Sequence, residues 1–283
     1  MFEPYPKFDC RGVSVPLFPW IMNLGLDRFE HVAKAIDALP PAGAEWSKIP
    51  ILVNEPSYIR FLAILASCDE AHVVSILNDF RDDRTFEVEM TNGLDEIERI
   101  SAPGDLRFHA ISLYVLVRAL RPAWVIETGV AHGKSSSFVL AALDHNRAGR
   151  LVSIDLPPDG HLADGSQTSL SGRQPGWLVP ERLRSHWDLL LGDSLAILPS
   201  ALDMTMPDGP DIFLHDSLHT YNHTASELEM ALGVAKSRER TVLVDNLDMG
   251  SGYAFADLCS SRRTLGVAYR DFGGARFAGV AGQ

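Results

Sequence analysis

The chain has 283 residues, of which 46% are hydrophobic and 22% are charged, and these values are typical of a globular protein with one catalytic domain and an extension. Its 25 Lys and Arg residues against 37 Asp and Glu residues give a formal net charge of −12. Because a phosphate backbone is bound by clustered Lys and Arg, this charge argues against a nucleic acid as partner or substrate.

The N-terminal segment and the cysteines exclude further classes of protein. The segment shows neither the basic region nor the apolar core of a signal peptide, and no apolar run approaches the length of a membrane span. Cys10, Cys68 and Cys259 lie far apart, and their odd number and spacing predict neither a disulfide framework nor a zinc site. We therefore expect a cytoplasmic protein that does not interact with membranes.

Residues 1–105 predict a mainly helical extension. Residues 1–24 are rich in Pro and aromatic residues, as in an extended arm, and apolar residues recur at helical spacing over 27–39. A second helix is predicted to begin near Asn54 and a third at Asp69. We expect this extension to form a lid over the carboxyl edge of a sheet, or an interface in a homo-oligomer. The apolar face of the third helix comprises Val73, Val74, Ile76, Leu77 and Phe80.

The segment that follows predicts a ligand-binding unit. A helix over 106–120 leads into an apolar strand over 124–126, a glycine-bearing loop over 127–133, a helix over 134–143 and a second strand over 150–155. A buried strand that feeds a helix through a tight loop places backbone N–H groups at the carboxyl edge of a parallel sheet, where open α/β folds bind ligands. Asp155, at the end of the second strand, is then placed to hold a ribose diol.

The spacing of the loop indicates which nucleoside it binds. A dinucleotide fold requires G-x-G-x-x-G, whereas here Gly129 and Gly133 are four residues apart and Glu127 precedes them. A carboxylate at this place would repel a pyrophosphate but suits a ligand that carries an ammonium group. We expect Gly129 to admit the ligand, so that a valine would block binding in a folded protein.

The pattern E-x-G-x-x-x-G, followed by Asp155, resembles the first two motifs of class I S-adenosylmethionine-dependent methyltransferases. In that family an acid at the end of the third strand, here predicted over 187–191, contacts the adenine, and the resemblance assigns this role to Asp193. An equally open alternative is that Asp193 or Ser194 only caps the helix predicted over 195–202. The residues expected to bind S-adenosylmethionine are Glu127, Thr128, Gly129, His132, Gly133, Ser135, Asp155, Gly192, Asp193, Ser194 and Asp216.

Two further strands predict the catalytic edge. The strand over 211–214 runs into H-D-S-L-H-T-Y, followed by a helix over 224–235, and the strand over 241–244 ends in Asp245 and Asn246. Oxygen donors from Asp216, Asp245 and Asn246 are then expected to converge on a hard cation such as Mg²⁺. The open alternative is that these residues form turns, as Asp and Asn often do.

These residues also carry a second resemblance. An Asp at one strand end and an Asp-Asn pair at the next resemble the metal site of catechol-type O-methyltransferases, although His215 takes the first ligand position when the strands are aligned on Phe213. The run H-D-S-L-H-T-Y resembles family 24 methyltransferases, whose usual form is D-x-x-H-x-Y. The resemblance implies that His219 is the general base, with His215 as a second candidate and Asp216 beside them.

The last residues complete the expected fold. Apolar runs over 265–272 and 275–280, separated by Gly273 and Gly274, predict an antiparallel hairpin. The resemblance thus implies a Rossmann-like seven-stranded methyltransferase sheet with this C-terminal hairpin over 106–283. The loop over 157–180, which carries Gln174 and Trp177, is expected to cover the site.

The resulting expectation is an S-adenosylmethionine-dependent O-methyltransferase that acts on a small-molecule hydroxyl of a natural product, sugar or phenol, with a divalent metal and a His base. Two alternatives stay open. One is an NAD-dependent oxidoreductase on a similar sheet, which the glycine spacing disfavours. The other is a protein that binds S-adenosylmethionine without catalysis, or that serves as an oligomer partner.

Overall fold

The computed structural model describes residues 7–10, 13–16, 53–54, 58–100, 109–158, 170, 172–234, 240–246, 250–262, 267–270 and 276–280. Three sequence predictions lie outside these residues: the helix over 27–39, the glycine turn at 273–274 and the middle of the loop over 157–180.

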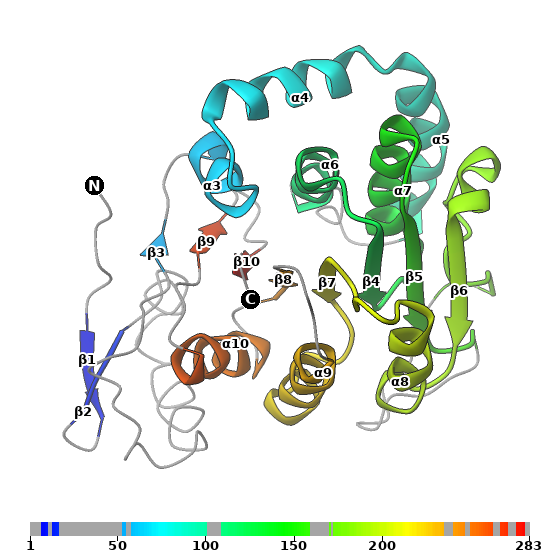
Figure 1. Ribbon diagram of the computed structural model, residues 1–283. Helices are drawn as coiled ribbons and strands as arrows, with labels where there is room; N and C mark the ends of the chain where they lie inside the picture. The colour runs from blue at the N-terminus through cyan, green and yellow to red at the C-terminus, as the bar shows by residue number, and fades with distance from the viewer. Residues whose placement is uncertain are drawn as a thin grey trace.

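A central sheet with the strand order β3-β9-β10-β8-β7-β4-β5-β6 dominates the described part of the chain (Figure 1). Five neighbouring strands run parallel, as the α/β prediction requires. Three of them have the bounds predicted from the sequence, because their apolar runs are closed by charged or turn-forming residues. The five are β4 (Trp124–Thr128), β5 (Arg150–Asp155), β6 (Trp187–Leu191), β7 (Ile212–His215) and β8 (Thr241–Val244).

The far side of the sheet is built from the end of the chain and from one piece of the N-terminal extension. Strand β10 (Arg276–Val280) pairs antiparallel with β8 and with β9 (Val267–Arg270). Strand β3 (Val53–Asn54) adds a parallel neighbour to β9. The sheet therefore has eight strands where seven were expected, because two residues are too few to show a strand period in the sequence.

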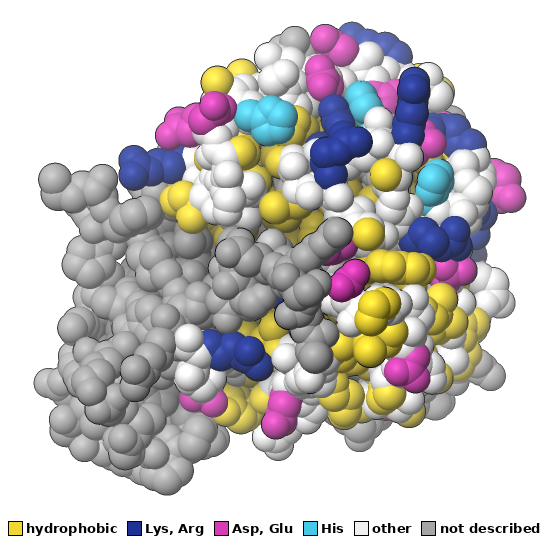
Figure 2. Space-filling model, viewed as in Figure 1, with side chains coloured by type: hydrophobic (Ala, Val, Ile, Leu, Met, Phe, Trp, Pro, Cys, Tyr) yellow, Lys and Arg dark blue, Asp and Glu magenta, His cyan; other side chains and the backbone are white. Residues whose placement is uncertain are grey.

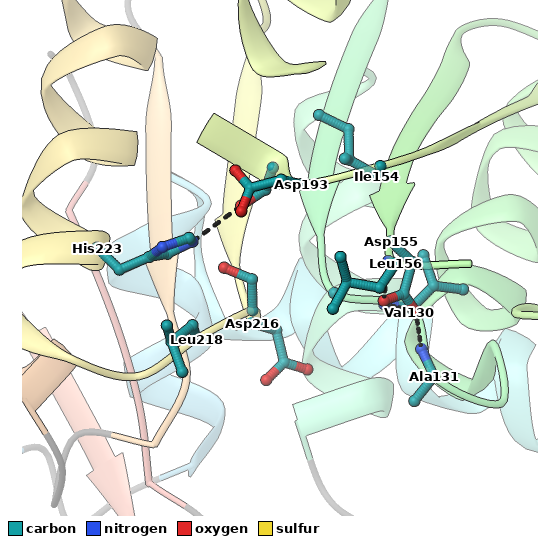
Figure 3. Close-up of a pocket in the computed structure, with 13 residues that line it drawn as sticks. Val130, Ala131, Ile154, Asp155, Leu156, Asp193, Asp216, Leu218 and His223 are labelled. Carbon is teal, nitrogen blue, oxygen red and sulfur yellow. Dashed lines mark hydrogen bonds between the residues drawn. The ribbon is translucent and has the colours of Figure 1, made fainter. Parts of the chain in front are cut away.

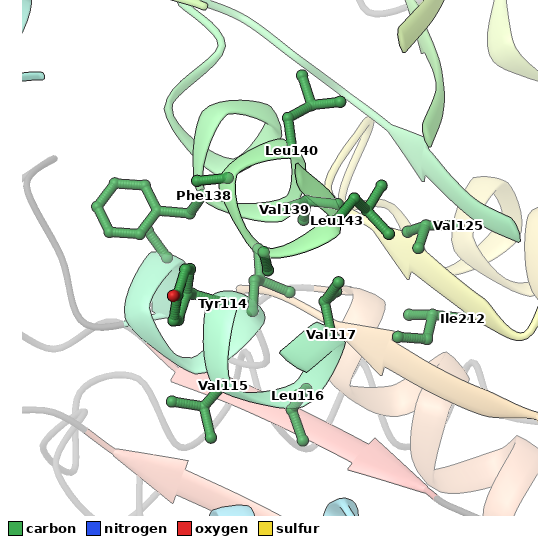
Figure 4. Packing of buried hydrophobic residues seen from close by; sticks show 14 of the residues in the cluster. Tyr114, Val115, Leu116, Val117, Val125, Phe138, Val139, Leu140, Leu143 and Ile212 are labelled. Atoms are coloured by element: carbon green, nitrogen blue, oxygen red, sulfur yellow. The ribbon is translucent and has the colours of Figure 1, made fainter. Parts of the chain in front are cut away.

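Side chains alternate between the two faces of the sheet, and helices cover both faces. Val125, Leu151 and Ile212 point to the face covered by α6 (His109–Leu120) and α7 (Lys134–Asn146), whose packing Figure 4 shows. Ile126, Val152 and Phe213 point to the opposite face. That face is covered by α8 (Ser194–Met204), α9 (Tyr221–Gly233) and α10 (Gly250–Ser261).

The helices of the extension join the α6–α7 side of the molecule. They are α3 (Tyr58–Leu65), α4 (Glu70–Asp82) and α5 (Arg84–Ile100), and their buried residues form one cluster with those of α6 and α7. Phe80 contacts Tyr114 with ring centroids 4.8 Å apart, and Phe86 packs edge-on against Phe138 at 5.1 Å. The described helices thus extend one helical layer of the sheet rather than close over its carboxyl edge. The boundary near residue 105 stays a prediction, because 101–108 lie outside the described residues.

The rest of the extension contains one feature that was predicted and one that was not. Asp69 caps α4 by accepting a hydrogen bond from the His72 amide at 2.7 Å, as its position predicted. Strands β1 (Lys7–Cys10) and β2 (Val13–Pro16) form a small antiparallel sheet within the expected extended arm. Among the described helices none alone has the length and hydropathy of a membrane span, and α3 and α4 meet that test only together, with a 108° bend between them.

The aromatic contacts give a test of how far α5 belongs to the core. Phe86 is 2% exposed whereas Val88, on the same helix, is 63% exposed. Phe86→Ala should lower the free energy of unfolding by about 3–5 kcal/mol, and the control Val88→Ala by less than about 0.5 kcal/mol. Urea unfolding followed by circular dichroism measures both. An unchanged main transition in Phe86→Ala would show instead that α5 unfolds separately from the sheet.

Candidate functional site

A pocket opens at the carboxyl edge of the parallel strands, between the loops that follow β4, β5, β6 and β7 (Figure 3). Val130, Ala131 and Asp155 lie on one side, and Leu218 and His223 on the other. The cavity measures about 200 Å³, below the roughly 300–1,000 Å³ usual for ligand sites, so it encloses only part of a cofactor-sized ligand. The lining residues are Gly129, Val130, Ala131, Ile154, Asp155, Leu156, Gly192, Asp193, Ser194, Asp216, Ser217, Leu218 and His223.

The glycine loop between β4 and α7 is held in a left-handed conformation at three positions. The backbone φ is +86° at Gly129, +47° at Ala131 and +91° at Gly133. A Cβ atom at residue 129 would overlap the backbone carbonyl of Asp216 in the loop after β7. Gly129 therefore allows two loops to touch, so the expected effect of a valine is corrected: it would disturb the chain itself as well as ligand access.

Glu127 lies behind this loop rather than in the pocket. Its carboxylate is fully buried and accepts hydrogen bonds from the hydroxyls of Ser135 at 2.5 Å, Ser136 at 2.6 Å and Ser153 at 2.8 Å. Burial raises the pKa of Glu127, and the three serine hydrogen bonds oppose the rise. The structure therefore gives Glu127 and Ser135 a role in supporting the loop, where the sequence had suggested that Glu127 faces a ligand ammonium group.

Asp155 and Asp193 line the pocket, and each also holds backbone amides. Asp155 accepts from the amides of Val130 at 3.1 Å and Ala131 at 2.7 Å, so it fixes the glycine loop. Burial raises the pKa of Asp155, although these hydrogen bonds oppose the rise. Asp193 caps α8 through the Leu195 amide at 2.9 Å. The capping alternative for Asp193 is therefore correct, and its place in the pocket leaves the adenine contact open as well.

His132 is turned toward the segment after the long loop. The indole N–H of Trp177 donates to His132 Nδ1 at 2.8 Å, and the amides of Gly176 and Leu178 donate to the carbonyls of Ala131 and His132. Residues 172–180 thus lie on the outside of the glycine loop and brace it. His132 does not line the pocket in this structure, and its predicted cofactor contact stays a prediction.

His215 is the least suited of the predicted bases. It is fully buried, and its Nδ1 lies 2.7 Å from Glu227 while its Nε2 lies 2.9 Å from the Thr224 hydroxyl. A base must reach the proton that it removes, and both ring nitrogens are engaged inside the protein. The structure therefore corrects the assignment of His215 as a candidate base.

Glu227, on α9, is the site residue that the sequence reading missed. Burial opposes its ionisation, but hydrogen bonds from His215 and His223 outweigh this effect and hold the pKa of Glu227 far below its usual value. A signal was available, because His223 and Glu227 are four residues apart on one helix and so share a face. Among the described residues its carboxylate is bonded to Thr128, Ser194, His215, Ser217 and His223.

Asp216 and Asp245 lie side by side at the ends of β7 and β8. Burial and the negative charge of Asp245 raise the pKa of Asp216 well above its usual value. Asp245 is 6% exposed, and its Oδ1 atom has no hydrogen-bond partner among the residues that the structure describes. The sequence thus predicted correctly that these two strand ends bring their carboxylates together.

His219 and Asn246 complete this group. The Asn246 side-chain N–H donates to His219 Nε2 at 2.8 Å, which leaves the amide oxygen of Asn246 for another partner. His219 Nε2 also lies 3.6 Å from Asp216 Oδ1. Tyr221 instead donates to Asp257 of α10 at 3.1 Å, and burial with this neighbouring charge raises the pKa of Tyr221 to about 12, so this residue packs.

Of the three predicted metal ligands, the structure brings Asp216 and Asp245 side by side, and the metal site itself stays a prediction. Within the described ranges, no three His, Cys, Asp or Glu side chains are placed to hold one metal ion. The expected set has two carboxylates, Asp216 and Asp245, and takes its third oxygen from the amide of Asn246.

The burial of Glu127 predicts how stability depends on pH. Because its folded pKa is raised, the folded state binds more protons than the unfolded state above the unfolded value of about 4.3, and stability falls as pH rises through that window. Glu127→Gln cannot titrate but keeps an acceptor for the serines. The free energy of unfolding of Glu127→Gln minus that of the parent should therefore increase with pH from about 4 upward, by at most about 1.4 kcal/mol per pH unit.

Urea unfolding between pH 4 and 8 measures this difference. The exposed Glu229→Gln is the matched control, and its difference from the parent should stay flat with pH. A flat line for Glu127→Gln as well would contradict a raised pKa of Glu127.

Comparison with known proteins shows which family and which structures this chain resembles. The model of the family 24 methyltransferase domain matches residues 126–246, the stretch from β4 to the end of the β8 loop. A search of curated protein sequences gives no match. Among solved structures, cofactor-bound Rv0187 from MTB is 16% identical with a TM-score of 0.50, and the alignment covers 73% of this chain and 95% of that one.

Two further structures were compared. A protein from Staphylococcus aureus, provisionally named a caffeoyl-CoA O-methyltransferase, is 14% identical with a TM-score of 0.50, covering 76% of this chain and all of that chain. TomG, an O-methyltransferase of tomaymycin synthesis from Streptomyces achromogenes in complex with S-adenosylmethionine, is 19% identical with a TM-score of 0.47, covering 71% and 90%.

At these identities the likeness to the two structures with a TM-score of 0.50 shows a shared fold, and the family match adds the motifs. The glycine loop, Asp155 and the segment from His215 to Tyr221 all lie inside the matched stretch. Residues 126–246 of this chain therefore match a methyltransferase domain, the class of enzyme that the motifs predicted.

Proposed function

We propose that the protein is an O-methyltransferase that binds S-adenosylmethionine in the pocket and acts on a small-molecule hydroxyl of a natural product, sugar or phenol. The observation that carries the proposal is the meeting of Asp155, Asp193 and Asp216 around one pocket at the sheet edge. Carboxylates suit the ribose hydroxyls and the positive charge of this cofactor, and they would repel a pyrophosphate. The O-methyltransferase names of two compared proteins agree with it.

The chain's residues would act mainly by positioning and by moving one proton. The bound cofactor supplies an electrophilic methyl group on a sulfonium, which an acceptor oxygen attacks in line. His219 would accept the proton that leaves this oxygen at Nε2, once the acceptor hydroxyl replaces the hydrogen bond that Asn246 donates there. Residues that fix the two partners in near-attack geometry supply much of the rate.

A divalent cation such as Mg²⁺ fits the residues at this edge. The carboxylates of Asp216 and Asp245 adjoin, and Asp245 Oδ1 is buried with no partner among the described residues. Asp216, Asp245 and the amide oxygen of Asn246 would hold the cation. It would lower the pKa of the acceptor hydroxyl and orient it beside His219.

The other candidate functions have less support. An NAD-dependent oxidoreductase would place a pyrophosphate beside Asp155 and above the buried Glu127. A protein that binds the cofactor without catalysis would have no use for His219 beside Asp216. Methyl transfer to nitrogen would use the same residues, and the acceptor in the test below decides between them.

A small-molecule acceptor also agrees with the surface charge. On the face shown in Figure 2, Lys and Arg side chains lie among acidic ones rather than in one basic patch. A net charge of −12 points the same way. A homo-oligomer built through the N-terminal extension stays a prediction.

Cofactor binding is tested at Asp155. Asp155→Ala should weaken binding of S-adenosylhomocysteine by about 1–3 kcal/mol, because it removes an acceptor and releases the amides of Val130 and Ala131. Asp155→Asn keeps one oxygen and should lose less. Calorimetric titration of the parent with S-adenosylhomocysteine and with NAD is the reference. Binding of NAD but not of S-adenosylhomocysteine would reject the proposed function.

Chelation distinguishes a mechanism that needs a metal ion from one that uses His219 as a base without a metal. If Asp216, Asp245 and Asn246 hold Mg²⁺, turnover with a panel of hydroxyl acceptors should fall in excess chelator and return with Mg²⁺. Asp245→Ala should lose turnover with cofactor affinity nearly intact, while the exposed control Asp203→Ala should match the parent. Full turnover in chelator would reject the metal.

The role of His219 as base is tested by the pH dependence of turnover. The pH profile of turnover should show a limb that disappears in His219→Ala, since an imidazole base works only when it is unprotonated. Persistence of this limb in His219→Ala would assign it to another group.

A further inference from the structure

Three side chains on one wall of the pocket are held by the same buried carboxylate. Ser194, Ser217 and His223 line the pocket, and all three are bonded to Oε1 of Glu227. The Ser217 hydroxyl lies 2.8 Å from this oxygen and His223 Nε2 lies 3.0 Å from it. Glu227 itself is fully buried and is not among the lining residues, so it acts on the pocket only through these neighbours.

The directions of these hydrogen bonds follow from the carboxylate. An ionised carboxylate only accepts, so the single hydrogen of each serine hydroxyl points to Glu227 and away from the pocket. His223 Nε2 lies 2.8 Å from Ser194 Oγ and 3.0 Å from Glu227 Oε1, and since neither oxygen has a hydrogen to give it, the single N–H of this nitrogen is shared between the two. The hydroxyls of Ser194 and Ser217 therefore present only lone pairs to a ligand, and the Asp193 carboxylate adds further acceptors beside them.

We propose that Glu227 is a positioning residue that makes this wall a surface of hydrogen-bond acceptors, and that the wall thereby selects a nucleoside with an exocyclic amino group over one with a carbonyl oxygen. The inference rests on the proposed function, in which this pocket holds the nucleoside of S-adenosylmethionine. The amino group of adenine donates two hydrogens, which suits lone pairs. A carbonyl oxygen at the same place would face lone pairs and leave buried acceptors unpaired, which is the stronger kind of discrimination.

A glutamine at residue 227 would reverse part of this polarity. Its side chain has nearly the same shape, but its amide nitrogen donates two hydrogens and accepts none. Where this nitrogen takes the place of Oε1, the hydroxyls of Ser194 and Ser217 lose their acceptor and turn as donors toward the pocket. Glu229, two residues along α9 and exposed, offers the matched control.

The test compares S-adenosylhomocysteine with S-inosylhomocysteine, which has a carbonyl oxygen in place of the amino group and a hydrogen on the adjacent ring nitrogen N1. Both ligands are measured by calorimetric titration of the full-length parent, Glu227→Gln and Glu229→Gln. The parent and Glu229→Gln should bind the adenine form about 10-fold or more tightly. In Glu227→Gln the preference should fall toward equal affinity. A general loss of pocket structure would weaken the binding of both ligands, whereas a change of wall polarity should weaken the binding of the adenine form more than that of the inosine form.

A second variant covers the case in which Glu227→Gln does not fold, as judged by circular dichroism. Ser217→Ala removes one acceptor from the wall and leaves Glu227 with its other partners, and it should lower the preference several-fold. An unchanged preference in the folded variants would overturn the inference. A parent that binds both ligands equally would overturn it while the proposed function stands, and a parent that binds neither ligand would reject the proposed function itself.

Discussion

The buried carboxylate of Glu227 is the interaction on which the site depends most. From its place on α9, it is bonded to Thr128 at the end of β4, to His215 at the end of β7 and to Ser194 at the start of α8. These elements come from four separate parts of the chain, and they meet at the edge where the pocket opens. A buried charge of this kind is tolerated only when several donors replace the lost water, which explains why so many polar side chains surround it.

Glu127 is equally buried but behaves in the opposite way. Its partners are the hydroxyls of Ser135, Ser136 and Ser153, which are neutral, and burial therefore raises the pKa of Glu127. Glu227 is bonded to two imidazoles as well as hydroxyls, and the pKa falls. The two residues thus show that the partners, and not burial alone, decide whether a buried carboxylate stays ionised.

Much of the fold could be predicted from the sequence because the strands of a buried parallel sheet are continuous apolar runs with sharp ends. The bounds of β5, β6 and β8 were predicted to the residue. Strand β3 could not be found, since its pairing with β9 depends on the distant C-terminal strands. Local pattern carries no information about such a contact.

The site was predictable in its position but less so in the orientation of its side chains. Asp155, Asp193 and Asp216 line the pocket as expected, because the ends of parallel strands must share one edge. His215 was one of the residues misjudged, although the alternation of side chains along a strand predicts its direction. It lies two residues after Phe213, which faces α8, α9 and α10, so its side chain points to the same buried face.

The glycine loop and the loop after β7 are joined directly to each other. The Asp216 amide donates to the Thr128 carbonyl at 2.8 Å, and Gly129 touches the Asp216 backbone so closely that no side chain fits between them. A displacement of the cofactor loop must therefore move the residues beside His219 as well. Methyl transfer requires donor and acceptor to be held within a fraction of an ångström, and a shift of about 1 Å can cost two orders of magnitude in rate. The left-handed glycine at 129 meets this requirement by joining the two loops directly, without a side chain whose rotamer could vary.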